Sequence, residues 1–197
     1  IFADCNYEQM LETTVRSSFT NQGEICLCGS RILVERSIYE KFRKDFTEKV
    51  KALRVGDPLL EETDTGAIVS KQHFDKIMYH ISLAVNEGGR VLCGGKAARL
   101  PGRCSGGWFI EPTVIENLPY NCRTNLEEIF GPVVTLMPFD TEEQAIGISN
   151  STEYGLASIL WTENLTRAHR IAAELKSGIV WINCWMARDL RTPFGGV

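Results

Sequence analysis

A cysteine-bearing segment at residues 21–31 combines residue types that could do nucleophilic chemistry. It reads Asn-Gln-Gly-Glu-Ile-Cys-Leu-Cys-Gly-Ser-Arg, so Cys26 follows a glycine and precedes a predicted strand. A free thiol has a pKa of about 8.5 and becomes a useful nucleophile near neutral pH when its anion is stabilised. Backbone N–H groups or the positive ring of a cofactor could stabilise it. The same residues also fit a buried pair, because free cysteine is among the most buried residue types.

The elements that must position this segment alternate between helix and strand. Helical spacing covers residues 7–19, a break follows at 20–23, and residues 31–35 predict a short strand. Further helices are expected at 37–53, 70–87, 140–150 and 164–176, and further extended segments at 91–93, 108–115, 133–139, 157–161 and 179–183. The expected helix caps are Ser37 with Glu40, Ser70, and Asp140 with Glu143. This alternation predicts an α/β fold with a mostly parallel sheet and helices on its faces.

Composition excludes several classes of protein. The chain has 197 residues, 44% hydrophobic and 23% charged, which is typical of one globular domain with a sizeable core. The net charge is -4 and no basic block is present, so a nucleic-acid partner is not expected. No apolar run approaches the roughly 18 residues of a membrane span, so no membrane partner is expected either.

The seven cysteines and the chain ends add two expectations. The cysteines are odd in number and irregularly spaced, which favours free thiols in a reducing, cytoplasmic compartment. The chain starts without Met on two apolar residues and stops at Pro-Phe-Gly-Gly-Val. We therefore expect a fragment of a longer protein.

Segment 21–31 resembles the cysteine motif of the aldehyde dehydrogenase superfamily, Asn-x-Gly-[Gln/Glu]-x-Cys followed five residues later by Arg. The matching residues are Asn21, Gly23, Glu24, Cys26 and Arg31. Segments 126–132 (Leu-Glu-Glu-Ile-Phe-Gly-Pro), 150–157, 177–183 and 193–196 resemble further family signatures in the same order. The resemblance covers essentially the whole chain. It implies a three-layer αβα catalytic domain over residues 1–197, with the cofactor-binding domain and the C-terminal oligomerisation strand outside it.

The resemblance implies a covalent mechanism. In this family the thiolate, here Cys26, adds to an aldehyde, and a hydride then passes to the nicotinamide of NAD or NADP. Water hydrolyses the resulting thioester to the acid. The backbone N–H of Cys26 would form part of an oxyanion hole. Glu128 matches the carboxylate that holds the nicotinamide ribose, and Phe130 matches the aromatic residue that positions the same end of the cofactor. Taken alone, Glu128 would fit a solvated carboxylate and Phe130 a core residue.

The same resemblance places other parts of the machinery elsewhere. The family's general-base Glu lies in a Glu-Leu-Gly-Gly-Lys motif upstream of residue 1, and its oxyanion-hole Asn lies further upstream. Glu24 matches a structural position of the cysteine motif and is not expected to replace that base. The chain alone is therefore expected to be inactive, and the full-length enzyme is expected to be a homodimer or homotetramer.

Residues 183–194, Asn-Cys-Trp-Met-Ala-Arg-Asp-Leu-Arg-Thr-Pro-Phe, point to a substrate class. They resemble the substrate entrance of semialdehyde dehydrogenases of aromatic ring cleavage, which act on 2-aminomuconic or 2-hydroxymuconic 6-semialdehyde. Because an Arg fork suits a carboxylate, Arg188 and Arg191 are the candidate substrate ligands. The alternative is that they pair with surface acids. Trp185 and Phe194 are the candidate apolar pocket residues, although Trp185 could instead belong to the core.

No metal site is expected. His73, His80 and His169 fall on predicted helices without metal-ligand spacing and are expected at the surface, and Cys26 and Cys28 lack the C-x-x-C spacing of a zinc site. Three other functions remain open at this point. They are a CoA-acylating dehydrogenase, a thiol esterase on the same fold, and a non-catalytic scaffold domain.

Overall fold

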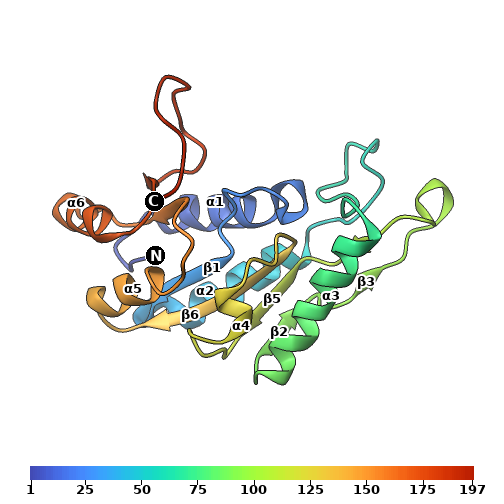
Figure 1. Cartoon of the computed structure of the whole chain (residues 1–197), viewed down its shortest axis with the longest axis horizontal. Coiled ribbons are helices and arrows are strands. Elements are labelled where there is room, and N and C mark those ends of the chain that lie inside the picture. Colours follow the sequence, from blue (N-terminus) through green and yellow to red (C-terminus); the bar gives the residue numbers. More distant parts are fainter.

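The computed structural model describes residues 1–197 and has a mixed sheet between helical layers (Figure 1). The main sheet has the strand order β1-β6-β5-β2, formed by β1 (Arg31–Glu35), β6 (Val133–Phe139), β5 (Thr113–Glu116) and β2 (Arg90–Cys93). β1, β6 and β5 are parallel, and β2 is antiparallel to β5. A second, parallel pair joins β7 (Ala157–Leu160) to β8 (Ile179–Ile182). The prediction of an α/β fold with a mostly parallel sheet is confirmed.

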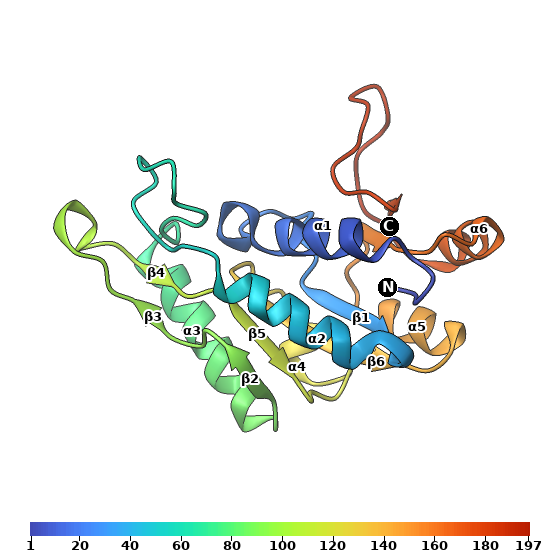
Figure 2. The same ribbon diagram turned by 180° about the vertical axis from the view of Figure 1, so that it is seen from behind.

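Helices cover both faces of the main sheet. Figure 2 shows α1 (Tyr7–Phe19) and α2 (Arg36–Lys51) in front of the sheet, where they contact each other and strands β1 and β6. The opposite face carries α3 (Lys71–Asn86), the single-turn α4 (Arg123–Leu126) and α5 (Glu142–Ser149). α6 (Leu165–Glu174) packs beside α5. The short strands β3 (Ala97–Ala98) and β4 (Phe109–Ile110) form a hairpin around η2 (Gly102–Cys104).

The helical faces follow the apolar spacing of the sequence. Phe42 and Phe46 on α2 are fully buried, and their rings stack 5.1 Å apart in a cluster with Val34 and Leu136 of the sheet. Burying each such side chain contributes roughly 1.5–3 kcal/mol. The helical spacing of the sequence also predicts that Val85 and Leu165 lie on the apolar faces of the helices expected at 70–87 and 164–176, and both predictions are wrong. Val85 is 51% exposed and Leu165 is 72% exposed, because each lies at the solvent edge of its helix.

The helix caps divide into one correct prediction and two wrong ones. Ser70 caps α3, and its Oγ accepts from the backbone N–H of His73 at 3.2 Å. Ser37 instead donates to Glu35 at 2.7 Å, inside a helix that already begins at Arg36. Asp140 is engaged by the guanidinium of Arg36, so the neighbouring Thr141 caps α5. The ion pair with the distant Arg36 therefore replaces the capping role that local spacing predicted for Asp140.

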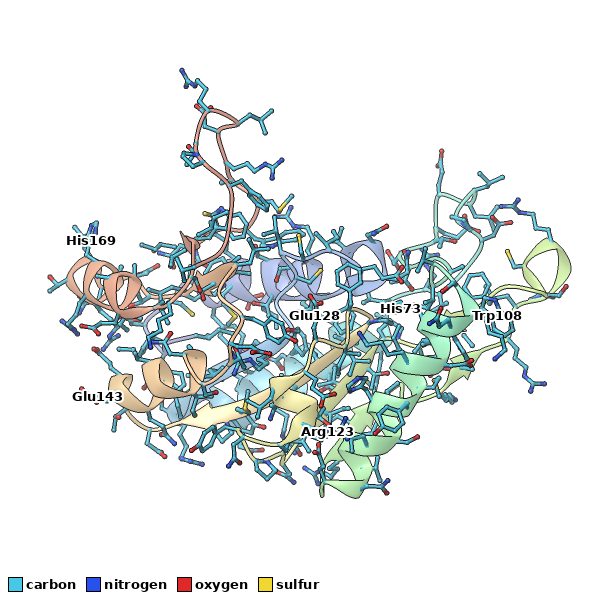
Figure 3. All side chains as sticks on the ribbon, viewed as in Figure 1. His73, Trp108, Arg123, Glu128, Glu143 and His169 are labelled. Atoms are coloured by element: carbon cyan, nitrogen blue, oxygen red, sulfur yellow. The ribbon has the colours of Figure 1, made fainter.

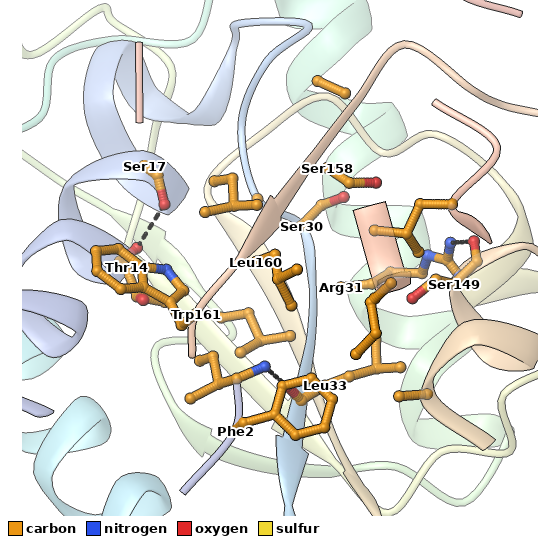
Figure 4. Close-up of a pocket in the computed structure, with 18 of the residues that line it drawn as sticks. Phe2, Thr14, Ser17, Ser30, Arg31, Leu33, Ser149, Ser158, Leu160 and Trp161 are labelled. Carbon is orange, nitrogen blue, oxygen red and sulfur yellow. Dashed lines mark hydrogen bonds between the residues drawn. The ribbon is translucent and has the colours of Figure 1, made fainter. Parts of the chain in front are cut away.

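The first two residues connect the main sheet to the β7–β8 pair. The backbone N–H of Phe2 donates to Trp161 at 2.9 Å, and the carbonyl of Ile1 accepts from Glu35 at 2.9 Å. Ile1 and Phe2 also line a cavity of about 190 Å³, which is bounded by α1, β1 and β7 and lined mostly by apolar residues (Figure 4). Arg31 reaches from the cavity wall to the carbonyls of Ile148 and Ser149, at 3.0 and 2.9 Å, and so caps the end of α5. No helix is both long enough and apolar enough to cross a membrane.

Candidate active site

Cys26 lies at the tip of a tight turn. The backbone N–H of Cys28 donates to the carbonyl of Ile25 at 2.9 Å, which closes the turn around Cys26 and Leu27. Cys26 is exposed, and each of the other six cysteines is partly buried. The backbone N–H of Cys26 donates to no group of the chain. A thiol and an unengaged N–H therefore stand on the same residue at the surface of the loop.

Contacts on both sides immobilise the backbone of this turn. On its exit side, Gly29 donates to Ser17 at 3.1 Å and accepts from the hydroxyl of Ser18 at 2.9 Å, which fastens the loop to α1. The indole N–H of Trp185 donates to the carbonyl of Leu27 at 2.9 Å. Because these bonds hold residues 27 and 29 to two separate elements, the position of the thiol is set by tertiary contacts.

The approach to the turn is a left-handed segment. Asn21, Gln22 and Gly23 in η1 (Thr20–Gly23) have φ values of 51°, 57° and 70°. A Cβ at Gly23 would overlap the Gly131 carbonyl group, with its carbon at 2.6 Å. A residue larger than glycine would therefore separate the cysteine loop from the Glu-Glu-Ile-Phe-Gly-Pro segment. This close approach explains the glycine at position 23, and a Cβ at Gly131 would in turn meet the Ile77 side chain at 2.5 Å.

A histidine connects the same two segments a second time. Nε2 of His73 lies 2.6 Å from the carbonyl oxygen of Phe130, and the two rings pack edge to face with centroids 5.9 Å apart. The same nitrogen lies 3.5 Å from Oε1 of Glu24, which also accepts from the backbone N–H of Val69 at 3.3 Å. The Glu24 carboxylate is thus used within the scaffold, as its place in the cysteine motif predicted.

Glu128 differs from the acid beside it. Glu127 receives two hydrogen bonds from Arg123, at 2.6 and 3.2 Å, and these bonds hold the pKa of Glu127 below its usual range. Glu128 is exposed, and its carboxylate forms neither an ion pair nor a hydrogen bond within the chain. In Figure 3, Glu128 and His73 are both labelled near the middle of the molecule, whereas His169 lies at its far end on α6. The structure thus leaves the Glu128 carboxylate available to a ligand.

Burial separates the thiols further. Burial raises the pKa of Cys28 to about 11, and it also raises the pKa values of Cys5, Cys93 and Cys122. A thiol with a raised pKa holds less thiolate near neutral pH and reacts more slowly with electrophiles. Burial therefore makes Cys28 a poor nucleophile near neutral pH, although it lies only two residues from the exposed Cys26.

The predicted substrate residues near the C-terminus lie in two environments. Trp185 is buried at 8% exposure in a cluster with Leu27 and Trp181, beside the cysteine turn. Arg188 and Arg191 are exposed, as is Phe194 at 53%. Arg191 pairs with Asp189, and the guanidinium carbon of Arg188 lies 5.6 Å from the centroid of the Phe194 ring.

The expectation that all three histidines lie at the surface is wrong for His80 and incomplete for His73. His80 is 4% exposed on the sheet-facing side of α3, and burial lowers its pKa. The His73 side chain is 16% exposed because it reaches down from the first turn of α3 to the Phe130 carbonyl. Only His169 has the expected exposure. The sequence signal for His73 was its place three residues after the Ser70 cap, where a helix starts beside a loop.

The site brings together three segments that are far apart in the sequence. Residues 21–28, 66–73 and 128–132 meet through the Gly23, Gln22 and His73 contacts, with Gln22 bonded to Gly66 and Ala67 at 3.1 and 3.2 Å. An exposed thiol with an unengaged N–H can attack a carbonyl carbon and donate to the resulting oxyanion. No cluster of three or more His, Cys, Asp or Glu side chains is arranged to hold a metal ion.

Comparison with known proteins agrees with this geometry. The sequence model of the aldehyde dehydrogenase family matches residues 1–197, and the chain belongs to that family. A 2-aminomuconic semialdehyde dehydrogenase of Mus musculus is 48% identical over 100% of this chain and 41% of its own length. A 2-aminomuconic 6-semialdehyde dehydrogenase of Pseudomonas sp is 45% identical, and a 2-hydroxymuconic semialdehyde dehydrogenase of Pseudomonas putida is 42% identical, each over 100% of this chain and 40% of its own length.

Solved structures of the family superpose on the whole chain. HpcC from Thermus thermophilus matches with a TM-score of 0.96 at 40% identity, over 100% of this chain and 39% of that one. Betaine aldehyde dehydrogenase from Staphylococcus aureus, in complex with NAD+, matches with a TM-score of 0.93 at 36% identity over the same shares. The chain therefore spans about two fifths of the length of the relatives it matches.

Proposed function

We propose that this chain is the cysteine-bearing catalytic domain of an enzyme that oxidises a carboxylate-bearing semialdehyde to the acid, with NAD as the hydride acceptor. The observation that carries the proposal is the exposed Cys26, held at the tip of a turn with its own N–H unengaged. The motif around it lies against the Phe130–Pro132 segment, next to the proposed cofactor residues Glu128 and Phe130. The identity to several semialdehyde dehydrogenases supports the substrate class.

The chemistry follows from the groups on the turn. The thiolate of Cys26 bonds to the aldehyde carbon, the carbonyl π bond opens, and the negative charge moves to the oxygen. The backbone N–H of Cys26 donates to that oxyanion. When the oxyanion re-forms its carbonyl, the hydride leaves the same carbon and a thioester remains on Sγ. Water then gives a proton to the general base as it adds to the thioester, the C–S bond breaks, and the acid departs as the thiolate is restored.

The residues around the turn fit a nicotinamide cofactor. A bound nicotinamide ring would accept the hydride and, through its positive charge, would favour the thiolate. Glu128 is the proposed ligand of the ribose hydroxyls, because its carboxylate has no partner within the chain. Phe130 is the proposed aromatic contact, and its backbone is held against the cysteine loop by His73. An NAD+ complex of a structural relative supports NAD, and NADP remains an alternative cofactor.

Further groups complete the proposal. Arg188 and Arg191 are the proposed carboxylate ligands at the substrate entrance, with Trp185 and Phe194 as its apolar wall. The general base, the oxyanion-hole Asn and the cofactor-binding domain are assigned to the remainder of the full-length protein. That protein is proposed to work as a homodimer or homotetramer in the cytoplasm, where a chain with seven free cysteines would stay reduced.

Paired cysteine variants of the full-length enzyme test the proposal. Cys26→Ala should lower turnover of 2-aminomuconic 6-semialdehyde by on the order of 10³-fold or more, because the covalent step is lost. Cys28→Ala is the matched control, and it should keep activity within about threefold because that thiol is partly buried. The readout is the absorbance of reduced nicotinamide. Retained activity in Cys26→Ala would overturn the proposal.

Analysis of the reaction products and of thiol labelling separates the other functions on this fold. A CoA-acylating enzyme would form an acyl-CoA and need added CoA for turnover. A thiol esterase would hydrolyse esters without reducing NAD, and a scaffold domain would show no preferential labelling of Cys26. Formation of the free acid without CoA supports the hydrolytic dehydrogenase.

A further inference from the structure

We propose that His73 is a positioning residue that keeps the Glu128–Phe130 segment in register with the cysteine loop. This inference rests on the proposed function, because it concerns the distance between the reactive thiol and the cofactor-binding residues. His73 itself belongs to neither group, since it lies on α3 and contacts both loops from the side.

The backbone of Phe130 adopts a conformation that needs support from its surroundings. Its φ is 58°, in the left-handed region that an aromatic residue adopts at a cost of order 1–3 kcal/mol. Such a conformation persists only where the surroundings hold it. A carbonyl oxygen can only accept, so Nε2 of His73 carries the proton of the 2.6 Å bond to Phe130. The adjacent Gly131 is held in turn by its close approach to Gly23.

His73 has little freedom of its own. Its backbone N–H is bonded to the Ser70 cap at 3.2 Å, and its side chain is 16% exposed. The helix behind it is anchored by Ile77 and Ile81, which are buried at 0% and 4% exposure. A hydrogen bond from so rigid a group fixes its acceptor more strongly than one from a mobile side chain.

One nitrogen atom of His73 faces both loops. Nε2 lies 2.6 Å from the Phe130 carbonyl and 3.5 Å from the Glu24 carboxylate. Glu24 is two residues before Cys26, and Phe130 is two residues after Glu128. Loss of the imidazole therefore frees the backbone on the Glu128 side while the turn around Cys26 keeps its bonds to α1 and Trp185.

The decisive experiment compares three variants of the full-length enzyme. His73→Ala removes the donor, and His73→Gln supplies an N–H on a side chain of similar reach. His169→Gln changes an exposed histidine on α6 and serves as the matched control. Two measurements need no turnover. One is NAD affinity by fluorescence quenching, and the other is the rate of Cys26 alkylation by iodoacetamide without cofactor.

We expect His73→Ala to weaken NAD binding by about tenfold and to lower kcat by a similar factor, as for loss of one partly buried hydrogen bond. Alkylation of Cys26 should stay within about twofold of wild type, and His73→Gln should recover most of the NAD affinity. Wild-type affinity in His73→Ala would overturn the inference. So would equal losses of affinity and alkylation without rescue by Gln, because that result describes a general structural role. Failure of the proposed function would show separately, as an active Cys26→Ala enzyme.

A different contact carries a second inference, which also rests on the proposed function. We infer that Arg16 is a further ligand of the semialdehyde carboxylate, beside the proposed Arg188 and Arg191. Arg16 is exposed in the last turn of α1, and its guanidinium carbon lies 5.8 Å from the centroid of the Trp185 ring. The same indole donates to the carbonyl of Leu27, the residue after Cys26. The Trp185 indole therefore lies between Arg16 and the cysteine turn.

Charge distinguishes Arg16 from Arg191 of the C-terminal segment. The guanidinium of Arg16, like that of Arg188, forms no ion pair within the chain, whereas Arg191 is already paired with Asp189. A stacked guanidinium keeps its fork of N–H donors free in the plane of the group, which suits bidentate binding of a carboxylate. In a muconic semialdehyde the carboxylate and the aldehyde lie at opposite ends of a six-carbon chain, so the carboxylate needs a cation near the turn but not on it.

Substrate discrimination tests this second inference. In the full-length enzyme, Arg16→Ala should raise KM for 2-aminomuconic 6-semialdehyde about tenfold and leave KM for hexanal within about twofold. Arg99→Ala, which removes an exposed arginine from the β3–β4 region, is the matched control. Equal changes for the two aldehydes, or no change for either, would overturn the assignment. An enzyme that oxidises neither aldehyde before mutation would contradict the proposed function instead.

Discussion

The cysteine turn and the C-terminal segment 184–197 carry proposed site residues but are held very differently. Four anchoring contacts, from Ser17, Ser18, Trp185 and Val69, hold residues 24–29 to three other parts of the chain. Beyond Trp185, the C-terminal segment is exposed throughout, and Arg191 is bonded only to the neighbouring Asp189. The proposed nucleophile is thus held by tertiary contacts, whereas the proposed carboxylate ligands stand at the surface of the chain.

The difference follows from what each region must do. A nucleophile needs a fixed approach to the carbonyl carbon, and small displacements of such a group can cost large factors in rate. A surface arginine can still find its carboxylate by rotating about its long side chain. Changes near the turn should therefore affect stability and turnover, whereas changes after residue 187 should affect substrate preference alone.

The largest effect should come from a substitution that forces the cysteine loop away from the segment around Gly131. Gly23→Ala places a methyl group against the Gly131 carbonyl and requires a positive φ from alanine. We expect the full-length protein to lose about 2–4 kcal/mol of stability and most of its activity. Denaturant unfolding followed by fluorescence measures the loss. Gly147→Ala, in α5 with open space around it, is the control and should be neutral or slightly stabilising.

Thiol labelling should sharpen the comparison next. Burial raises the pKa of Cys28 to about 11, which lowers its thiolate fraction near neutral pH roughly 100-fold relative to an ordinary thiol. Exposed Cys26 should therefore be alkylated first by iodoacetamide. Because the folded pKa of Cys28 is raised, its contribution to stability is complete at neutral pH and is lost as the pH rises toward 11.

Peptide mapping by mass spectrometry after brief labelling at several pH values measures both thiols. The Cys28 label should appear only as the pH approaches 11. Similar labelling of Cys26 and Cys28 at neutral pH would contradict the contrast between an exposed and a partly buried thiol.

A smaller effect is expected at the proposed ribose contact. Glu128→Gln removes the charge of an exposed carboxylate that has no partner within the chain. We expect kcat to fall about tenfold with wild-type stability and wild-type alkylation of Cys26, since this substitution leaves the turn intact. Glu143→Gln, another exposed carboxylate at the start of α5, should leave kcat unchanged. A parallel loss of thiol reactivity in Glu128→Gln would place this residue with the cysteine loop instead.

The smallest effect should follow Arg191→Ala. The ion pair of Arg191 with Asp189 is solvent-exposed, and because water and salt screen such pairs, unfolding should be unchanged. If Arg191 also meets the substrate carboxylate, KM for the semialdehyde should rise about threefold while KM for hexanal stays constant. Steady-state kinetics with both aldehydes decides this, and a fall in stability would show that the C-terminal segment is more firmly held than its contacts indicate.

The amino-acid sequence alone determined the order of elements and pointed to Cys26 as the proposed nucleophile. Apolar spacing placed α1, β1 and α3 correctly, because one buried face dictates a period of two or 3.6 residues, and a continuous apolar run placed the fully buried β6. The motif around Cys26 led to the family, which the match over residues 1–197 shows. The cap at Ser70 was also predicted, since it depends on a bond within four residues.

Only the tertiary structure decided how the site is held. Ser37 and Asp140 do not cap helices, because their side chains bond to Glu35 and Arg36 instead. His73 was predicted to lie at the surface, yet the fold aims it at a carbonyl 57 residues further along the chain. Local spacing carries no information about contacts of that separation. They depend on which loops the packed sheet brings together, and at this site they decide where the thiol faces.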